Sequence, residues 1–178
     1  MTSSEKSKRP IVSSAHLVSE RSAELSEFEY GLIVASHAFN RWMVRCMAAA
    51  GVGDLGPLDI MVLHSVNHRG RDKKLADICF VLNVEDSHTV TYALRKLVRA
   101  GLVAARKNGK ETLYATTKTG RAACERYRQV REDCLMGALD VFAGAADGDL
   151  NRRVGAAADL LRAASGLYDQ AARAASSL

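Results

Sequence analysis

The sequence predicts a mainly α-helical protein with one small β-hairpin, and three observations carry the prediction. Apolar residues recur at helical spacing along most of the chain, in which hydrophobic residues make up 48% and aromatic residues only 6%. Two strand-like runs flank the pair Asn108-Gly109, the strongest short signal for a hairpin. The chain has 178 residues, enough for one domain with a buried core plus extensions.

The N-terminal region is predicted to contain an arm and one long helix. Residues 1–22 are rich in Ser, Lys and Glu and lack a steady periodicity, so we expect a flexible arm. Ser26 and Glu29 form a capping-box pattern, which predicts the start of a helix within residues 23–54. Its apolar residues step by four and three positions alternately, which predicts a narrow apolar seam. The seam consists of Phe28, Leu32, Ala35, Phe39, Trp42, Cys46 and Ala49.

Two shorter helices are predicted next. The glycine-rich residues 51–56 interrupt the first helix, and Pro57 suits the first position of the second. The core face of the second helix consists of Leu58, Met61, Val62, Leu63 and Val66. A basic loop, residues 68–72, follows without a clear strand, and Asp72 is predicted to cap the third helix. The apolar residues of that helix are Leu75, Ile78, Cys79, Val81 and Leu82.

Residues 87–100 predict a capped, basic fourth helix. Ser87 is the predicted N-cap, and Gly101 suits the left-handed position that ends a helix. The predicted inward stripe consists of Val90, Leu94, Leu97 and Val98. The outward face carries small hydroxyl side chains near the N-terminus and cations further along. Its members are His88, Thr89, Thr91, Tyr92, Arg95, Lys96 and Arg99.

The predicted hairpin has strands at residues 102–106 and 112–116 and concentrates positive charge at its tip. Lys107 and Lys110 lie in the turn, and Arg106 lies just behind it. Residues 87–121 carry a net charge of +7, whereas the whole chain carries +5. Basic charge localised on a helix and a hairpin predicts a surface for duplex DNA. The alternative interpretation is a solvated amphipathic helix with an ordinary surface hairpin.

The side chains of this surface suit different parts of DNA. Threonine methyls can touch thymine methyls, and Arg95 can pair with guanine in a bidentate fork. The predicted base-reading residues are His88, Thr89, Thr91, Tyr92 and Arg95. Cations that contact phosphates fix the register of the protein on the duplex. The predicted backbone-contacting residues are Ser87, Arg69, Arg71, Lys73, Lys96, Arg99, Arg106, Lys107, Lys110 and Lys118.

The C-terminal region, residues 121–178, is predicted to be helical. A long helix with a basic first half is expected from Thr119 to about Gly144, and a last helix from Asp149. The last helix repeats the four-and-three spacing of the first, so both seams suit the same partner. We expect a homodimer formed through residues that include Phe28, Leu32, Phe39, Leu150, Val154, Leu161 and Tyr168. The alternative is that the two helices pack on each other within one chain.

Three stretches of the sequence resemble the MarR-type bacterial transcription regulators. The pattern Ser-x-x-Val-Thr-x-x-x-x-x-Leu-x-x-x-Gly-Leu-Val at residues 87–103, with a hairpin that ends in Thr-Lys-Thr-Gly at 117–120, resembles the family's recognition helix and wing. Residues 55–63 and 75–77 resemble the starts of its second and third helices. The resemblance covers roughly residues 28–175. It implies a winged helix-turn-helix at residues 55–120 between terminal dimerisation helices.

The resemblance also implies a mode of action. Dimers that place two recognition helices about one helical turn apart read a pseudo-palindromic operator. Proteins of this type often bind a small aromatic acid in a cleft between the dimer helices and the DNA-binding lobe. Trp42, Arg45, His64 and His68 could contribute to such a pocket for an aromatic or anionic effector. The interpretation that we favour for these four is a core aromatic residue, a solvated charge and satisfied histidines.

Two departures from the family pattern indicate a divergent branch. The family's wing usually carries an Asp-x-Arg pair, whereas this wing has Asn108-Gly109-Lys110. Lysine is a point charge without the planar fork of arginine. Residues 78–86 are about one helical turn longer than usual, which either extends the third helix or loosens the turn.

The four cysteines do not predict a metal site. Cys46, Cys79, Cys124 and Cys134 form no Cys-x-x-Cys pair, and each lies in a predicted helix among apolar neighbours. Buried, inert thiols are therefore expected. The alternative is a thiol-based redox sensor, for which Cys46 beside Arg45 is the best candidate. We expect no metal and no cofactor.

The function predicted from these features is that of a sequence-specific DNA-binding transcription regulator. The alternative is a winged helix that serves as a protein-interaction module, although the polar face of residues 87–100 argues against it. No phosphate-cradling glycine loop or nucleophile elbow is present, so we do not expect an enzyme. No apolar run reaches the ~18 residues that span a bilayer, and no signal peptide is evident, so we expect a cytoplasmic protein without a membrane partner.

Overall fold

The computed structural model describes residues 15–19, 21–138 and 149–178. The chain divides into two units, Met1–Val130 and Arg131–Leu178, and each is described by itself. Much of the predicted arm, residues 1–14 and 20, lies outside the described residues. Its remainder contains a 3-10 turn, Ala15–Leu17, and a bridge between Ser19 and Ser22.

The first helix, α1, spans Ala23–Ala49. It begins earlier than predicted, because the Ser22 hydroxyl accepts a hydrogen bond from the backbone N–H of Leu25 at 3.3 Å. Ser26, the predicted cap, is buried inside the helix. The C-terminal part of α1 packs into the core through Met43, Cys46, Met47 and Ala50, whereas Leu32, Ile33, Val34 and Phe39 are exposed. Only part of the predicted seam is therefore covered in this unit.

The helix α2 spans Pro57–Asn67, and Pro57 takes the predicted first position. Its buried apolar residues are Ile60, Val62, Leu63 and Val66, whereas Leu58 and Met61 are half-buried. A 3-10 turn, His68–Gly70, follows, and then a strand, β1, at Lys73–Lys74. This strand was not predicted, because two residues are too few to show a periodicity.

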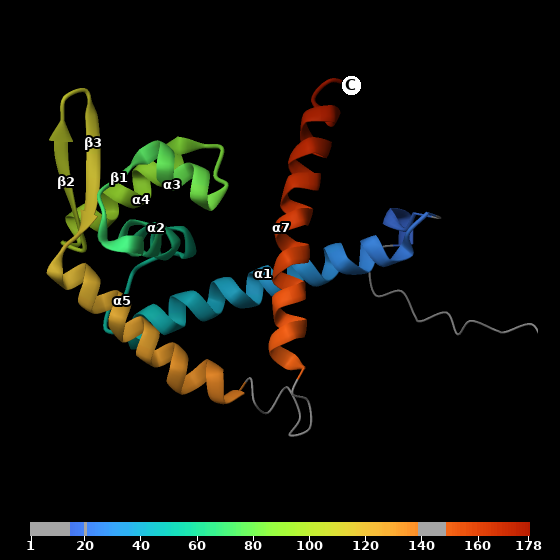
Figure 1. Ribbon diagram of the computed structural model, residues 1–178, viewed down its shortest axis with the longest axis horizontal. Coiled ribbons are helices and arrows are strands. Elements are labelled where there is room, and N and C mark those ends of the chain that lie inside the picture. Colours follow the sequence, from blue (N-terminus) through green and yellow to red (C-terminus); the bar gives the residue numbers. More distant parts are fainter. Residues whose placement is uncertain (1–14, 20, 139–148) are drawn as a thin grey trace, which may run out of the picture. The chain divides into compact units, whose positions relative to one another are not determined.

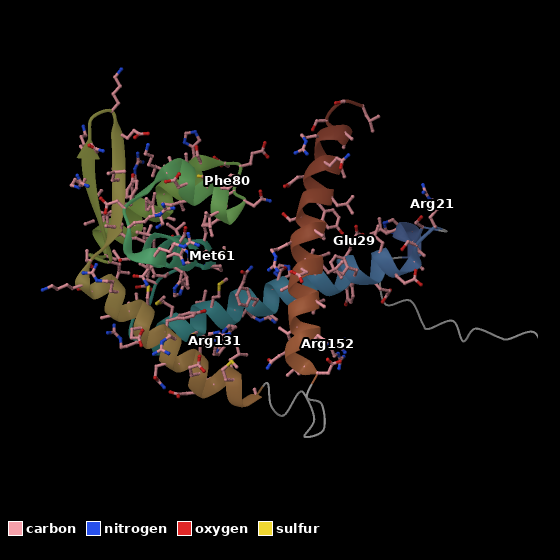
Figure 2. The ribbon with its side chains drawn as sticks, viewed as in Figure 1. Arg21, Glu29, Met61, Phe80, Arg131 and Arg152 are labelled. Atoms are coloured by element: carbon pink, nitrogen blue, oxygen red, sulfur yellow. The ribbon has the colours of Figure 1, made fainter. Side chains whose placement is uncertain are left out.

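The third helix, α3, spans Leu75–Leu82 and ends at Asn83, whose φ of 51° is left-handed. Asp72 does not cap it, which corrects the prediction. Instead, the Asp77 carboxylate accepts a hydrogen bond from the backbone N–H of Lys74 at 3.3 Å. Val81 and Phe80 are 68% and 87% exposed, so the predicted apolar face of α3 is only partly buried (Figure 2). The helix ends at Leu82, and residues 83–86 lead from it to the next helix.

The fourth helix, α4, spans Ser87–Arg99. Gly101 follows it with a φ of +70°, as predicted for a helix stop. The hairpin consists of β2, Val103–Asn108, and β3, Glu111–Thr116. Asn108 pairs with Glu111 in the ladder, so the two-residue turn is Gly109-Lys110, one position later than the Asn-Gly signal suggests. Gly109 takes the left-handed φ of +61° that this turn requires.

The sheet is antiparallel with strand order β1-β3-β2, and it lies at one end of the first unit beside α2, α3 and α4 (Figure 1). The helix α5, Lys118–Arg131, follows the hairpin and packs on the end of α1, where Arg126 Nε donates to the Ala50 carbonyl at 2.7 Å. A Cβ atom at Gly120 would lie 2.0 Å from the Leu102 carbonyl oxygen, so only glycine fits there. These elements share one hydrophobic core, which holds α4 and the hairpin in fixed positions relative to each other.

The second unit contains a π-helical turn at Glu132–Met136 and the helix α7, Leu150–Ala175. The predicted last helix is thus present, with Asp149 at its N-cap position. Residues 139–148, which include the predicted end of the preceding helix, lie outside the described residues. No residue of α7 is buried. Among the described residues, no helix is long and apolar enough to cross a membrane.

Candidate nucleic-acid interface

The outward face of α4 is available to a partner. His88, Thr89, Arg95 and Arg99 are exposed, and Tyr92 is 64% exposed. Thr91 is half-buried, and its hydroxyl donates to the Ser87 carbonyl at 2.9 Å. The hydroxyl of Thr89 likewise donates to the Asp86 carbonyl at 2.7 Å. In this arrangement both hydroxyls keep only acceptor capacity for a base edge, which suits an amino group of adenine or cytosine.

The start of α4 differs from the prediction. Asp86 is the N-cap, and its carboxylate accepts a hydrogen bond from the backbone N–H of His88 at 2.9 Å. Ser87 is the first helical residue instead of the cap. Asp86 takes the role because its extended backbone places the carboxylate, which also interacts favourably with the helix dipole, over the first turn.

The inward stripe of α4 is formed by Val90, Ala93, Leu94 and Leu97. Val98, predicted to be inside, is 37% exposed because Ala93 occupies the buried side in its place. Val98 instead lines a hollow of about 480 Å³ between α4 and the wing. The other lining residues are Tyr92, Arg95, Arg99, Ala105 and Tyr114.

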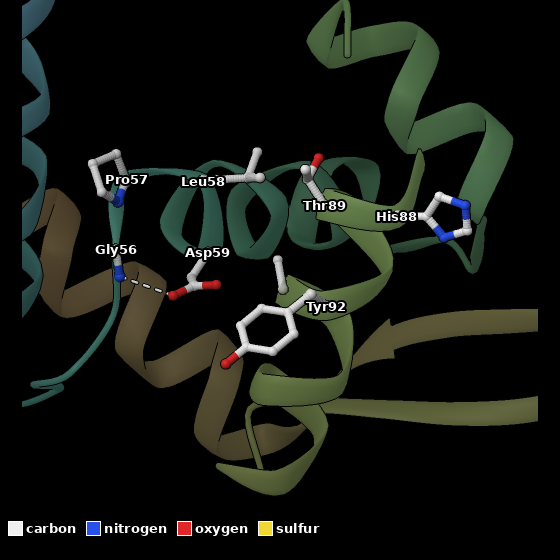
Figure 3. Close-up of a pocket in the computed structure, with 8 residues that line it drawn as sticks. Gly56, Pro57, Leu58, Asp59, His88, Thr89 and Tyr92 are labelled. Carbon is white, nitrogen blue, oxygen red and sulfur yellow. Dashed lines mark hydrogen bonds between the residues drawn. The ribbon is translucent and has the colours of Figure 1, made fainter. Parts of the chain in front are cut away.

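A second hollow, of about 460 Å³, lies between α4 and the first turn of α2 (Figure 3). Gly56, Pro57, Leu58 and Asp59 line one side, and His88, Thr89, Tyr92 and Ala93 line the other. The Asp59 carboxylate accepts a hydrogen bond from the backbone N–H of Gly56 at 2.8 Å. It also forms an ion pair with Lys96 Nζ at 2.8 Å, so Lys96 is engaged within the protein.

The wing is tied to the loop before α3 by two ion pairs. Arg106 lies 2.7 Å from the Asp72 carboxylate, and Lys74 lies 2.7 Å from that of Glu111. The hydrogen bond that Lys74 donates to the Glu111 carboxylate raises the pKa of Lys74. Lys107 and Lys110 at the tip are exposed, as is Lys118 beyond the hairpin. The wing therefore presents Lys107 and Lys110 as exposed cations at its tip, whereas Arg106 just behind them is paired.

The loop between α2 and α3 contributes fewer free cations than predicted. Arg69 and Arg71 are exposed, but Lys73 is only 6% exposed. Lys73 Nζ donates to the carbonyls of His68 at 2.6 Å and Arg71 at 3.2 Å, and burial lowers its pKa. Lys73 thus holds the loop together through these two carbonyls, and its phosphate contact stays a prediction.

The structure places the predicted effector residues in different surroundings. Arg45 lines a hollow of about 320 Å³ with His37, Asn40, Arg41, Val44 and Pro57. Trp42 packs against the core, and His68 is exposed in its loop. The ring of His64 lies 4.6 Å from that of Tyr127, edge to face, and its buried Nε2 has no hydrogen-bond partner among the described residues. Burial lowers the pKa of His64.

The thiols are mostly unreactive by position. Cys46 is 1% exposed and its Sγ donates to the Tyr127 carbonyl at 3.5 Å, while burial raises the pKa of Cys124 to about 11. Cys134 is exposed, contrary to the prediction that all four are buried, because it lies in the π-helical turn outside the first unit's core. Within the described residues, no cluster of three or more His, Cys, Asp or Glu side chains could hold a metal ion.

Comparisons with known proteins agree with this geometry. Residues 55–120 match the family model of the winged helix DNA-binding domain. RV1404 from Mycobacterium tuberculosis is similar in structure, with a TM-score of 0.62 and 20% identity over 77% of this chain and 93% of that one. Wild-type MarR from E. coli in its apo form gives a TM-score of 0.57 and 18% identity, over 75% and 94% of the two chains.

The chain has a winged-helix fold, which it shares with RV1404 and with MarR from E. coli. A third similar structure is that of the M. tuberculosis transcriptional regulator MOSR in complex with DNA, with a TM-score of 0.56 and 21% identity over 78% of this chain and 96% of that one. No curated protein sequence matches the chain. Within this fold, α4 lies beside the β2–β3 hairpin.

Sequence reasoning missed the acidic partners of this surface. Asp59 and Asp86 each bind a cation or a backbone N–H, and neither was assigned that role. Asp72 was predicted to cap α3 and instead pairs with Arg106. Asp59 could have been found from its place two residues after the helix-starting Pro57, where an acid commonly bonds back to the cap. No local pattern indicates Lys96 as its partner, because the two residues are 37 positions apart.

Proposed function

We propose that this protein is a sequence-specific DNA-binding transcription regulator. The observation that carries the proposal is the exposed face of α4, which presents Thr89, Tyr92 and Arg95 from a helix whose opposite side is fully buried. Base edges in a major groove require such a helix beside a cationic wing that holds phosphates. The free cations Lys107 and Lys110 at the wing tip meet the second requirement.

We infer further that the protein acts as a homodimer on a pseudo-palindromic operator. Apolar side chains on α1 and α7 support the dimer: Phe39 is 56% exposed, Val154 48% and Leu161 45%. Phe28, Leu150 and Tyr168 are half-buried, and Leu32 is 38% exposed. Rows of exposed apolar residues on long helices are usually covered by a partner, and a twofold partner duplicates the recognition helix.

The hollow beside Arg45 is the candidate site for a small anionic effector. The hollow beside Arg45 also contains Arg41 and His37, a set that can hold a carboxylate. Titration with benzoate, with benzyl alcohol as the neutral control, should change DNA affinity in the wild-type protein and not in Arg45→Ala. An equal response to both compounds would argue against this pocket.

The decisive experiment is selection of bound fragments from a random pool of duplex DNA at about 0.15 M salt, where nonspecific phosphate contacts are weakened. Enrichment of a two-part palindromic site would support the proposal. Binding without enrichment would contradict sequence-specific regulation, and no binding at all would favour a protein-interaction module.

A further inference from the structure

The recognition helix is joined to the first turn of α2 by one carboxylate. Oδ2 of Asp59 accepts a hydrogen bond from the backbone N–H of Gly56 at 2.8 Å (Figure 3). The same atom accepts a hydrogen bond from Lys96 Nζ, also at 2.8 Å. The side chain of Asp59 is 10% exposed and that of Lys96 is 32% exposed. The same oxygen atom therefore closes the start of α2 and holds α4.

Lys96 differs in this respect from its neighbours on α4. Arg95 and Arg99 are exposed, and neither forms an ion pair within the described part of the chain. To reach a phosphate, Lys96 would have to leave Asp59 as a nearly buried charge without its partner. Removing one partner of a buried ion pair is costly, so the pair is expected to persist when DNA is bound.

The remaining contacts of α4 do not set its rotation as sharply. Its inward side consists of Val90, Ala93, Leu94 and Leu97, all aliphatic. Apolar packing is non-directional, whereas a charge-assisted hydrogen bond has a defined geometry. Bidentate reading of a base requires side chains to be held within about 0.5 Å of their working positions.

We propose that Asp59 and Lys96 are positioning residues that fix the rotation of the recognition helix on α2 and thereby set sequence selectivity. Lys96 is then not a phosphate contact, although its sequence position suggests one. This inference rests on the proposed DNA-binding function. It assigns an indirect role to two residues whose side chains need not touch DNA.

The test compares the wild-type protein with Lys96→Met, Asp59→Asn, the double variant and Lys96→Arg. Methionine keeps the length of the side chain without its charge, and asparagine keeps an acceptor for the Gly56 N–H. The probes are the duplex that the wild-type protein selects and a scrambled duplex of the same composition. Affinity for both is measured at several salt concentrations, and circular dichroism reports the helix content of each variant.

Each single variant should lose about tenfold in affinity for the selected duplex, the equivalent of one charge-assisted hydrogen bond. Affinity for the scrambled duplex and the salt slope should stay unchanged, because no phosphate contact is lost. The double variant should lose no more than either single one, since both remove the same interaction. Lys96→Arg should keep most of the selectivity, because a guanidinium can still reach Asp59.

Two results would overturn the inference while leaving the proposed function intact. One is an equal loss on both duplexes in Lys96→Met with a salt slope reduced by about 0.9, which marks a phosphate contact. The other is wild-type selectivity in the double variant. Because that variant removes both charges, it leaves no unpaired charge that could destabilise the fold. A wild-type protein that does not distinguish the two duplexes would instead overturn the proposed function, and with it the role of the pair.

Discussion

At the scale of single residues, the cations of the candidate interface fall into two groups: some are exposed, and others are bound by acceptors within the protein. Arg95, Lys107 and Lys110 are exposed, whereas Lys73 and Lys96 are held by acceptors inside the protein. The acceptors of Lys73 are two carbonyls, and that of Lys96 is a carboxylate 37 positions away. The sequence predicts that these lysines lie on the same surface. Only the folded chain shows which of their ammonium groups are exposed and able to contact a phosphate.

The exposed group predicts a division of labour between helix and wing. Arg95→Ala should change which sequences are bound, because a bidentate arginine contributes about 1–3 kcal/mol of discrimination at one base pair. Lys110→Ala should weaken binding to all duplexes and reduce the salt slope by about 0.9, as one phosphate contact is lost. Selection and salt titration of both variants test this. If the two variants behaved alike in sequence preference and salt slope, the assignment would be wrong.

A buried histidine predicts a dependence of stability on pH. Burial lowers the pKa of His64 below its ordinary value of 6.5 in the folded state, so the unfolded chain takes up this proton first as the pH falls. Well above pH 6.5 the histidine is neutral in both states and its burial has no protonation cost. Below that pH, stability should fall progressively until the lowered pKa is reached.

The measurement is urea unfolding at pH 7.5 and pH 5.0, with His64→Phe as the matched variant. Phenylalanine keeps a ring against Tyr127 but has no proton to bind. The wild-type protein should lose more stability than the variant between the two pH values. An identical loss would show that other groups account for the acid dependence.

At the scale of elements, side-chain hydrogen bonds at the helix starts and one close backbone contact, between Gly120 and Leu102, position α4 and α5. The Asp86 cap sets the start of α4, and the Thr117 hydroxyl accepts a hydrogen bond from the backbone N–H of Gly120 at 3.0 Å at the start of α5. The backbone of α5 then passes directly against Leu102, which precedes the wing. Helix and wing therefore share one rigid junction.

That junction predicts a marked effect of Gly120→Ala. The added Cβ would lie 2.0 Å from the Leu102 carbonyl oxygen, so backbone must shift, at a cost of about 1–3 kcal/mol. Gly31→Ala on α1 is the control, because a Cβ there meets nothing within 4 Å and alanine favours a helix by roughly 0.5–1 kcal/mol over glycine. Thermal unfolding should move in opposite directions for the two variants. A stabilised Gly120→Ala would refute the close packing.

At the scale of the whole molecule, the two long helices carry apolar residues that the described chain leaves exposed. On α1, Ile33 and Phe39 are 55% and 56% exposed, and single-chain proteins seldom leave such apolar rows open. The helix α7 has no buried residue at all. These surfaces are the physical basis for the proposed dimer.

The dimer predicts the effect of charges placed on these surfaces. Phe39→Glu and Leu161→Glu should lower the mass measured by light scattering to that of one chain, because unpaired carboxylates would be buried in the interface. Asn151→Glu, on an exposed polar position of α7, is the control and should leave the mass unchanged. A wild-type protein with the mass of one chain would favour the intramolecular alternative.

The sequence by itself determined the order of the helices, the hairpin, the Gly101 stop and the outward face of α4. These features follow from periodicity and from glycine geometry, which act within a few residues and are therefore legible in a single chain. The positions of the predicted DNA contacts, of the effector and of the dimer remain predictions at the level of single residues.

Only the tertiary structure decided the remaining features. It showed β1 beside β3, the burial of Ala93 in place of Val98, the capture of Lys73 and the pairing of Asp59 with Lys96. Each depends on groups brought together from distant parts of the chain. Their energies come from burial and directed hydrogen bonds in three dimensions, and no local spacing encodes them.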